Sequence, residues 1–197
     1  AVSFKAAQTG EGASRGLQAD VLVYEPEADR IDFVADLAVR WIRLRRTPVG
    51  DRRIALILAN YPNRDGRMAN GVGLDTPASC LNILRALKQA GYTVGLLPET
   101  GDALMAQLAA GVTNDPEGHG LRPVKQSLSL ERYQSFFKSL PLSVQRGVQG
   151  RWGAAATEWQ RWHPMVADTA NEAASLPIAG IQFGHVFVGI QPSRGYD

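Results

Sequence analysis

The sequence contains a single cysteine, Cys80, which excludes an internal disulfide. It also lacks a CxxC pair and any cluster of histidine with cysteine, so we expect no structural zinc site and a reducing compartment. No apolar run approaches the ~20 residues that cross a bilayer, and the first residues lack the apolar core of a signal peptide. We therefore expect a cytoplasmic protein without a membrane partner.

Catalytic and metal-binding patterns are scarce as well. The three histidines, His119, His163 and His185, have no second ligand at a metal-binding spacing, and there is no GxSxG or HExxH motif. Lys and Arg number 21 against 19 Asp and Glu, and this net charge of +2 argues against a dedicated nucleic-acid binder. We assign no metal ligand and no catalytic residue, and we interpret His185 as a core histidine within a strand.

A strand, a helix and a second strand are predicted in the middle of the chain. Residues 54–59 (IALILA) and 92–97 (YTVGLL) have strand composition. The intervening segment has helical periodicity, with Thr76 as N-cap, Gly91 as C-cap and a buried face of Cys80, Ile83, Leu84 and Leu87. This order predicts a right-handed βαβ unit with parallel strands.

Further helices are predicted on both sides of this unit. One covers residues 25–46, with Pro26 in its first turn, and another covers 102–110. A helical hairpin follows, capped by Ser129 and resuming at Pro141. The expected buried positions are Val34, Leu37, Ala38, Trp41 and Leu44 in the first helix, and Leu130, Tyr133, Phe136, Phe137 and Leu140 in the hairpin.

The fold class that results is α/β, with a parallel βαβ sheet core, flanking helices and a helical hairpin. At 197 residues and 45% hydrophobic composition, we expect one domain over residues 19–197, with a helical insert at about 127–152. Residues 1–18 form a poorly defined segment. Residues 178–191 form either a hairpin or two consecutive strands, split at Gly184. Because the chain stops in a polar segment after this strand, we expect an internal piece of a longer protein.

The connection from strand to helix, residues 60–77, is the candidate binding loop. Its eighteen residues far exceed the two to six of a simple βα turn. Gly66, Gly71 and Gly73 do not fit a phosphate-loop pattern, and Asp75 would repel an anion at the helix start. Its arginines, amides and carboxylates suit a ligand edged with carboxylates and amides. The alternative is a long loop held by its own Asn and Asp side chains.

Six arginines surround the end of the first helix. Either they form a solvated basic face, or they bind a polyanionic ligand or an acidic partner, including another domain of the same protein. Nucleic acid is the weaker interpretation because no aromatic residues alternate with them. The residues are Arg40, Arg43, Arg45, Arg46, Arg52 and Arg53.

Two long segments resemble a known family. ALILANYPNRDGRMANGVGLDTPAS and LRALKQAGYTVGLLPETGDALMAQL are similar to the large chelatase subunits, a family that contains the CobN-type subunit of aerobic cobaltochelatase and the large subunit of magnesium chelatase. VADLAVRWIRLRRTP and FGHVFVGIQPSRGYD extend the resemblance over most of residues 19–197. It implies an enzyme of cobalamin biosynthesis that inserts cobalt(II) into a tetrapyrrole, hydrogenobyrinic acid a,c-diamide. The alternatives are magnesium insertion into protoporphyrin, or a scaffold domain that docks ATPase subunits through the arginine-rich helix.

The resemblance also implies the partners and the site. Two AAA+-type subunits would hydrolyse ATP with magnesium, and cobalt would be a substrate, so no cofactor is expected on this piece. The remaining domains of the subunit would be needed for activity and would carry the metal-delivering residues. The substrate-binding residues implied by the family's loop and by its IQPxRGY motif are Asn60, Asn63, Arg64, Asp65, Arg67, Asn70, Asp75, Gln191, Arg194 and Tyr196.

Overall fold

The computed structural model describes residues 5–9, 22–60, 65–115, 121–154 and 175–192. The chain divides into two compact units, Ala1–Pro48 and Val49–Asp197. The predicted domain over residues 19–197 and the limits of its helical insert stay predictions. Within the described ranges, no helix combines the length and the apolar character needed to span a membrane.

The first unit contains a two-stranded sheet and one helix. Strand β1 (Lys5–Thr9) pairs antiparallel with β2 (Leu22–Pro26), and helix α1 covers Ala28–Arg46. The helix begins later than predicted because Glu25 and Pro26 belong to β2, and Glu27 takes the N-cap position in an extended conformation. It ends at Arg46, before Pro48, as the sequence predicts.

The predicted buried stripe of α1 is wrong. No residue of this helix is buried, and Trp41 is 63% exposed. Val34, Leu37, Ala38 and Leu44 are exposed as well. Helical periodicity identifies an apolar face but says nothing of the surface that covers it. Among the described residues of this unit, only β1 and β2 accompany the helix.

The second unit is built on a three-stranded mixed sheet with the order β3-β7-β6. Strand β3 (Ile54–Leu58) runs parallel to β7 (Val186–Ile190), and β6 (Gly180–Phe183) runs antiparallel to β7. The hairpin between β6 and β7 turns at Gly184, whose φ of 61° is readily reached only without a Cβ. The predicted α/β class is confirmed, the strand predicted at 54–59 covers 54–58, and residues 180–190 form the hairpin rather than two consecutive strands.

The predicted strand at residues 92–97 is wrong, and so is the βαβ unit that it was expected to complete with residues 54–59. This segment forms no ladder, and the parallel partner of β3 is β7, from the far end of the described chain. The segment does run beside the sheet, since the backbone N–H of His185 donates to the carbonyl of Thr93 at 2.8 Å. Its composition indicates an extended backbone, whereas strand pairing depends on contacts that are distant in sequence.

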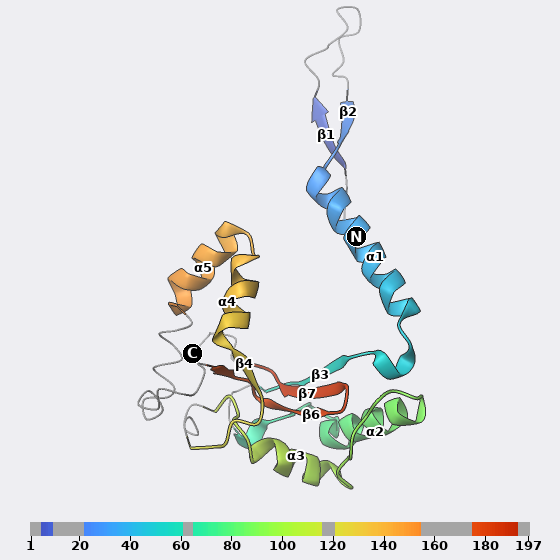
Figure 1. The fold of residues 1–197 in the computed structure, drawn as a ribbon, viewed down its shortest axis with the longest axis vertical. Helices are drawn as coiled ribbons and strands as arrows, with labels where there is room; N and C mark the ends of the chain where they lie inside the picture. Colours follow the sequence, from blue (N-terminus) through green and yellow to red (C-terminus); the bar gives the residue numbers. More distant parts are fainter. Residues whose placement is uncertain (1–4, 10–21, 61–64, 116–120, 155–174, 193–197) are drawn as a thin grey trace, which may run out of the picture. The chain divides into compact units, whose positions relative to one another are not determined.

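Two helices cover one face of this sheet, as Figure 1 shows. Helix α2 (Thr76–Gln89) and helix α3 (Gly101–Ala109) contact each other. A short 3₁₀ turn, η1 (Val49–Asp51), precedes β3. The side chains that fill the space between helices and sheet are the buried Leu58, Leu84, Leu104, Leu108, Val186 and Val188.

The ends and the buried face of α2 differ in detail from the prediction. Asp75, and not Thr76, is the N-cap; Ala90 is the C-cap, and Gly91 follows it. Cys80 and Leu84 are buried as predicted, but Ile83 is 48% exposed and Leu81 is buried in its place. The buried residues of α2 are therefore Cys80, Leu81 and Leu84, and this helix contacts α3.

The helical hairpin is confirmed. Strand β4 (Ser127–Ser129) pairs with β5 (Ser175–Pro177) and leads into α4 (Leu130–Lys138), which is followed by α5 (Leu142–Trp152). Ser129 caps α4 as predicted, with its hydroxyl accepting from the N–H of Arg132. The expected burial is wrong, because no residue of α4 is buried and Phe136 is 60% exposed. Leu130, Tyr133, Phe137 and Leu140 are half-buried, since only a few residues of the described chain pack on them.

Candidate functional site

The two predicted binding motifs emerge at the same end of the sheet. Asn60 lies two residues after the end of β3, and Gln191 directly follows β7. The strands are parallel neighbours, and the N–H of Gln191 donates to the carbonyl of Leu58 at 2.9 Å. Ligands of α/β sheets bind outside the carboxyl ends of parallel strands. The structure thus brings one residue of each motif to the expected edge.

The base of the 60–77 loop is tied to the end of β3. Asn60 forms an antiparallel bridge with Met68, and the N–H of Ala69 donates to the carbonyl of Ala59 at 2.8 Å. Ala69 is buried and has a φ of 57°, a conformation that costs a residue with a Cβ about 1–2 kcal/mol. Local strain of this kind clusters at functional sites, where the surrounding structure holds it.

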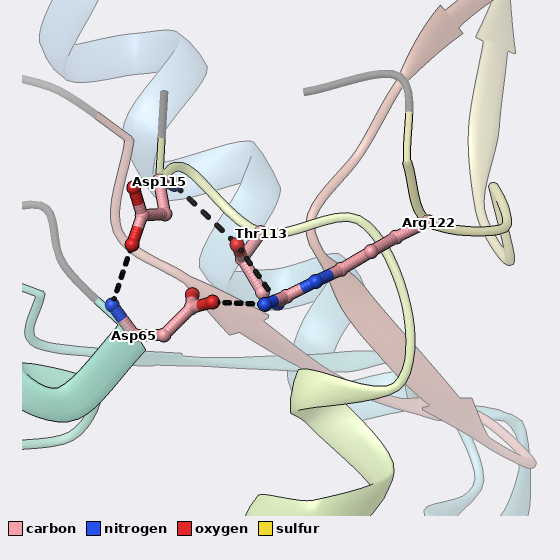
Figure 2. Close-up of polar contacts among 4 residues, drawn as sticks. All are labelled: Asp65, Thr113, Asp115 and Arg122. Carbon is pink, nitrogen blue, oxygen red and sulfur yellow. Dashed lines mark hydrogen bonds and ion pairs between the residues drawn. The ribbon is translucent and has the colours of Figure 1, made fainter. Parts of the chain in front are cut away.

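Asp65 joins the loop to a second segment of the chain. It opens the short 3₁₀ turn η2 (Asp65–Arg67), and its carboxylate pairs with the guanidinium of Arg122. Its N–H donates to Asp115 Oδ2 at 3.1 Å, and Arg122 Nη1 donates to Thr113 Oγ1 at 3.3 Å (Figure 2). The Asp65 and Arg122 side chains are 27% and 29% exposed, so the pair is partly shielded from water.

The same second segment also holds the end of β7. Asn114 Nδ2 donates to the carbonyls of Ile190 and Gln191, at 3.3 and 2.7 Å. No sequence motif assigns a role to Thr113, Asn114, Asp115 or Arg122. One signal was present: a run of Thr, Asn and Asp follows α3, in a connection longer than packing alone requires.

Two buried oxygens at this site have no hydrogen-bond partner among the described residues. They are Asn60 Oδ1 and Asp65 Oδ1. Asn60 is only 4% exposed, and a buried polar group without a partner is costly. Both atoms are hydrogen-bond acceptors, so each suits an N–H or O–H donor.

The other predicted site residues differ in their surroundings. Arg67 and Asn70 are exposed on the loop. Asp75 is occupied as the N-cap of α2, with Oδ1 accepting from the N–H of Ala78 at 2.9 Å. The residues Asn63, Arg64, Arg194 and Tyr196 lie outside the described part of the chain.

The opposite end of the sheet carries His185. The prediction of a core histidine within a strand is wrong, because His185 is half-buried and lies in the turn between β6 and β7. Its Nδ1 is 2.8 Å from the carbonyl of Gly50. Since a carbonyl only accepts, Nδ1 carries the proton. A shallow hollow of about 500 Å³ is lined there by Arg53, Gln182 and His185. In the described ranges, no three His, Cys, Asp or Glu residues form a group that could hold a metal; His119 and His163 lie outside those ranges.

The six arginines are shared between the two units. Arg40, Arg43, Arg45 and Arg46 belong to α1 in the first unit. Arg52 and Arg53 belong to the second unit, where Arg52 Nη1 donates to the Tyr92 hydroxyl at 3.4 Å.

Sequence comparison places these features in a known family. The family model described as CobN/Magnesium Chelatase matches residues 1–197. The chain belongs to the CobN/magnesium chelatase family. Among its relatives in this family, the aerobic cobaltochelatase subunit CobN of Pseudomonas aeruginosa is 49% identical over 179 residues, which cover 91% of this chain and 14% of that protein. The CobN subunit of a Sinorhizobium species is 46% identical over 197 residues, covering 100% of this chain and 14% of that protein.

The chain is also similar to a magnesium-chelatase subunit and to one solved structure. A magnesium-chelatase subunit of Chlorobaculum parvum is 31% identical over 171 residues, covering 87% of this chain and 12% of that protein. The catalytic subunit of cobaltochelatase from Mycobacterium tuberculosis has a TM-score of 0.71 and 30% identity, covering 99% of this chain and 15% of that one. The resemblance predicted from the sequence motifs is confirmed. The chain spans only 12–14% of the length of these curated relatives.

Proposed function

We propose that this chain is part of the large, tetrapyrrole-binding subunit of an ATP-dependent cobaltochelatase. The complete enzyme inserts cobalt(II) into hydrogenobyrinic acid a,c-diamide during cobalamin biosynthesis in the cytoplasm. The meeting of the 60–77 loop and Gln191 at the carboxyl ends of β3 and β7 carries this proposal. Identities of 49% and 46% to CobN subunits, against 31% to a magnesium-chelatase subunit, favour the cobalt branch.

The chemistry of the site suits such a macrocycle, which is edged with carboxylates and two carboxamides. The exposed guanidinium of Arg67 can donate a bidentate pair to a carboxylate. The exposed amide of Asn70 can both donate and accept, which a carboxamide requires. Arg64 and Asn63 precede Asp65 in the same motif and carry the same two functional groups, as do Arg194 and Gln191 in the second motif.

We assign cobalt delivery and ATP hydrolysis to other parts of the complete enzyme. Cobalt(II) is a substrate of the complete enzyme, and we place no metal ligand and no catalytic residue in this chain. Two AAA+-type partner subunits would hydrolyse ATP, and the remaining domains of the large subunit would complete the macrocycle site. The chain alone is expected to be inactive.

The test is macrocycle binding by the full-length subunit. Replacing Arg67 and Asn70 together by alanine should raise the Kd for hydrogenobyrinic acid a,c-diamide by roughly tenfold to a hundredfold, because a charge-assisted hydrogen bond and an amide bond are lost. Fluorescence quenching measures this affinity. The matched control is Arg85→Ala, whose guanidinium donates to the carbonyl of Glu99 away from the loop. It should leave the Kd unchanged.

Other outcomes would identify the alternatives. An unaltered Kd in the double variant would refute binding by the loop. Tighter binding of protoporphyrin than of the corrinoid precursor would assign the protein to the magnesium branch. If macrocycle binding were unaffected while charge reversal at Arg45 and Arg46 abolished pull-down of the ATPase subunits, the chain would be a docking scaffold.

A further inference from the structure

The connection after α3 touches both motifs of the proposed site. Four residues of this connection contact Asp65 or the end of β7, or orient a residue that makes such a contact. Together they are called the brace: Thr113, Asn114, Asp115 and Arg122. None of them belongs to either family motif identified in the sequence. Through these contacts, the brace connects the 60–77 loop with the end of β7.

Toward the loop, the brace makes two independent contacts with one residue. The carboxylate of Asp115 accepts from the N–H of Asp65 at 3.1 Å, and the guanidinium of Arg122 pairs with the Asp65 carboxylate (Figure 2). Backbone and side chain of Asp65 are thereby both held. Arg122 is itself oriented by the hydroxyl of Thr113, which is 4% exposed and also accepts from the N–H of Asp115 at 3.4 Å.

Toward β7, the brace makes two hydrogen bonds from one side chain. The amide of Asn114 donates to two successive carbonyls, those of Ile190 and Gln191. A single side chain that holds two consecutive carbonyls restrains the direction in which the backbone leaves the strand. Because Asn114 directly precedes Asp115, the contacts with β7 and with Asp65 come from adjacent residues.

We propose that the brace is a positioning device that sets the spacing between the 60–77 loop and the Gln191 motif, so that one macrocycle can contact both. This inference rests on the proposed function. A ligand that contacts two segments binds most tightly when both are held in place beforehand, because ordering them on binding costs free energy. The brace residues would act through the two motifs without touching the macrocycle.

A purely structural role makes a different prediction. If the network only stabilised the fold, its loss would lower Tm and would affect the macrocycle and ATP alike. If it positions the motifs, its loss should raise the KM for the macrocycle while kcat and the KM for ATP stay nearly constant.

The experiment uses the full-length subunit with its ATPase partners. Asn114→Ala removes the contact with β7, and Arg122→Ala removes the ion pair with the Asp65 carboxylate while leaving the hydrogen bond between Asp115 and the N–H of Asp65. Each should raise the KM for hydrogenobyrinic acid a,c-diamide by roughly tenfold, with kcat changed less than about twofold. Arg122→Lys keeps a cation opposite Asp65 and should restore part of the affinity, which also covers the case in which Arg122→Ala does not fold.

The double variant tests whether the brace acts as a unit. If tight binding needs both motifs to be held, losing the restraint on either one already removes most of the benefit. Asn114→Ala with Arg122→Ala should therefore raise KM by much less than the product of the single effects. Lys125→Ala is the matched control, because its amine donates to the carbonyl of Gln107 at 2.9 Å and contacts neither motif. It should leave KM unchanged.

Three results would overturn the proposal: an unchanged macrocycle KM in both single variants, single effects that multiply, or an equal rise in Lys125→Ala. Failure of the proposed function itself is distinguishable. In that case Arg67→Ala with Asn70→Ala would leave macrocycle affinity unchanged as well.

Discussion

The contact between α2 and α3 makes Gly101 intolerant of a side chain. Gly101 is the first residue of α3, and a Cβ built there would lie 2.9 Å from Ala78 N and 3.0 Å from both the carbonyl carbon and Cβ of Pro77. Two of these three atoms are backbone, and the third belongs to a rigid ring. None can rotate away, so Gly101→Ala must push the two helices apart.

The cost follows from two opposing terms. Overpacking of a well-packed contact destabilises by about 1–3 kcal/mol, whereas alanine gains up to about 1 kcal/mol over glycine in a helix. Taking the middle of each range, about 2 kcal/mol of overpacking less about 0.5 kcal/mol of helix propensity, the net loss is about 1–2 kcal/mol. For a domain of this size, that corresponds to a fall in Tm of roughly 2–8 °C, or a lower urea midpoint by roughly 0.5–1 M.

Gly147 in α5 is the matched control. No atom lies within 4 Å of a Cβ built there, so Gly147→Ala should stabilise by up to about 1 kcal/mol through helix propensity alone. Urea denaturation of the 197-residue chain, followed by far-UV circular dichroism, compares the two variants. A Gly101→Ala variant as stable as the parent, or a Gly147→Ala variant destabilised to the same extent, would refute the packing argument.

Two further predictions concern α2. Asp75→Ala should destabilise the chain by about 1 kcal/mol in urea denaturation, because the N–H of Ala78 loses its acceptor, whereas Asp75→Asn should retain most of the stability; equal loss in both would contradict capping. Burial raises the pKa of the Cys80 thiol above its usual 9.0. The buried neutral thiol therefore contributes its full stability to the fold below about pH 9, and this stability is lost as pH rises through the higher folded pKa. The parent should therefore lose more stability than Cys80→Ala between about pH 8 and about pH 10, and identical pH profiles would count against this assignment.

Local chemistry accounts for the elements that were predicted correctly. The apolar run at 54–58 forms β3, the hydroxyl of Ser129 caps α4, and Gly184 turns the β6–β7 hairpin. Each depends on residues within a few positions of one another, so one sequence suffices to identify it. The 60–77 loop was identified as a candidate in the same way, by its length and polar content.

Nonlocal contacts account for the differences. Periodicity marked an apolar stripe on α1, but whether Trp41 is buried depends on a covering surface that no helical pattern encodes. Strand propensity at residues 92–97 could not reveal that β7 would be the partner of β3. The ion pair between Asp65 and Arg122 joins residues 57 positions apart, so it could not be predicted without the tertiary fold.

By itself, the sequence determined the fold class, most helices and turns, and the family, since these depend on local patterns and on long motifs. The tertiary structure alone decided the pairing of β3 with β7, the meeting of the 60–77 loop with Gln191, and the brace that joins them. The physical reason is that hydrogen bonds and packing act through space. Which distant segments become neighbours depends on how the whole chain buries its apolar surface.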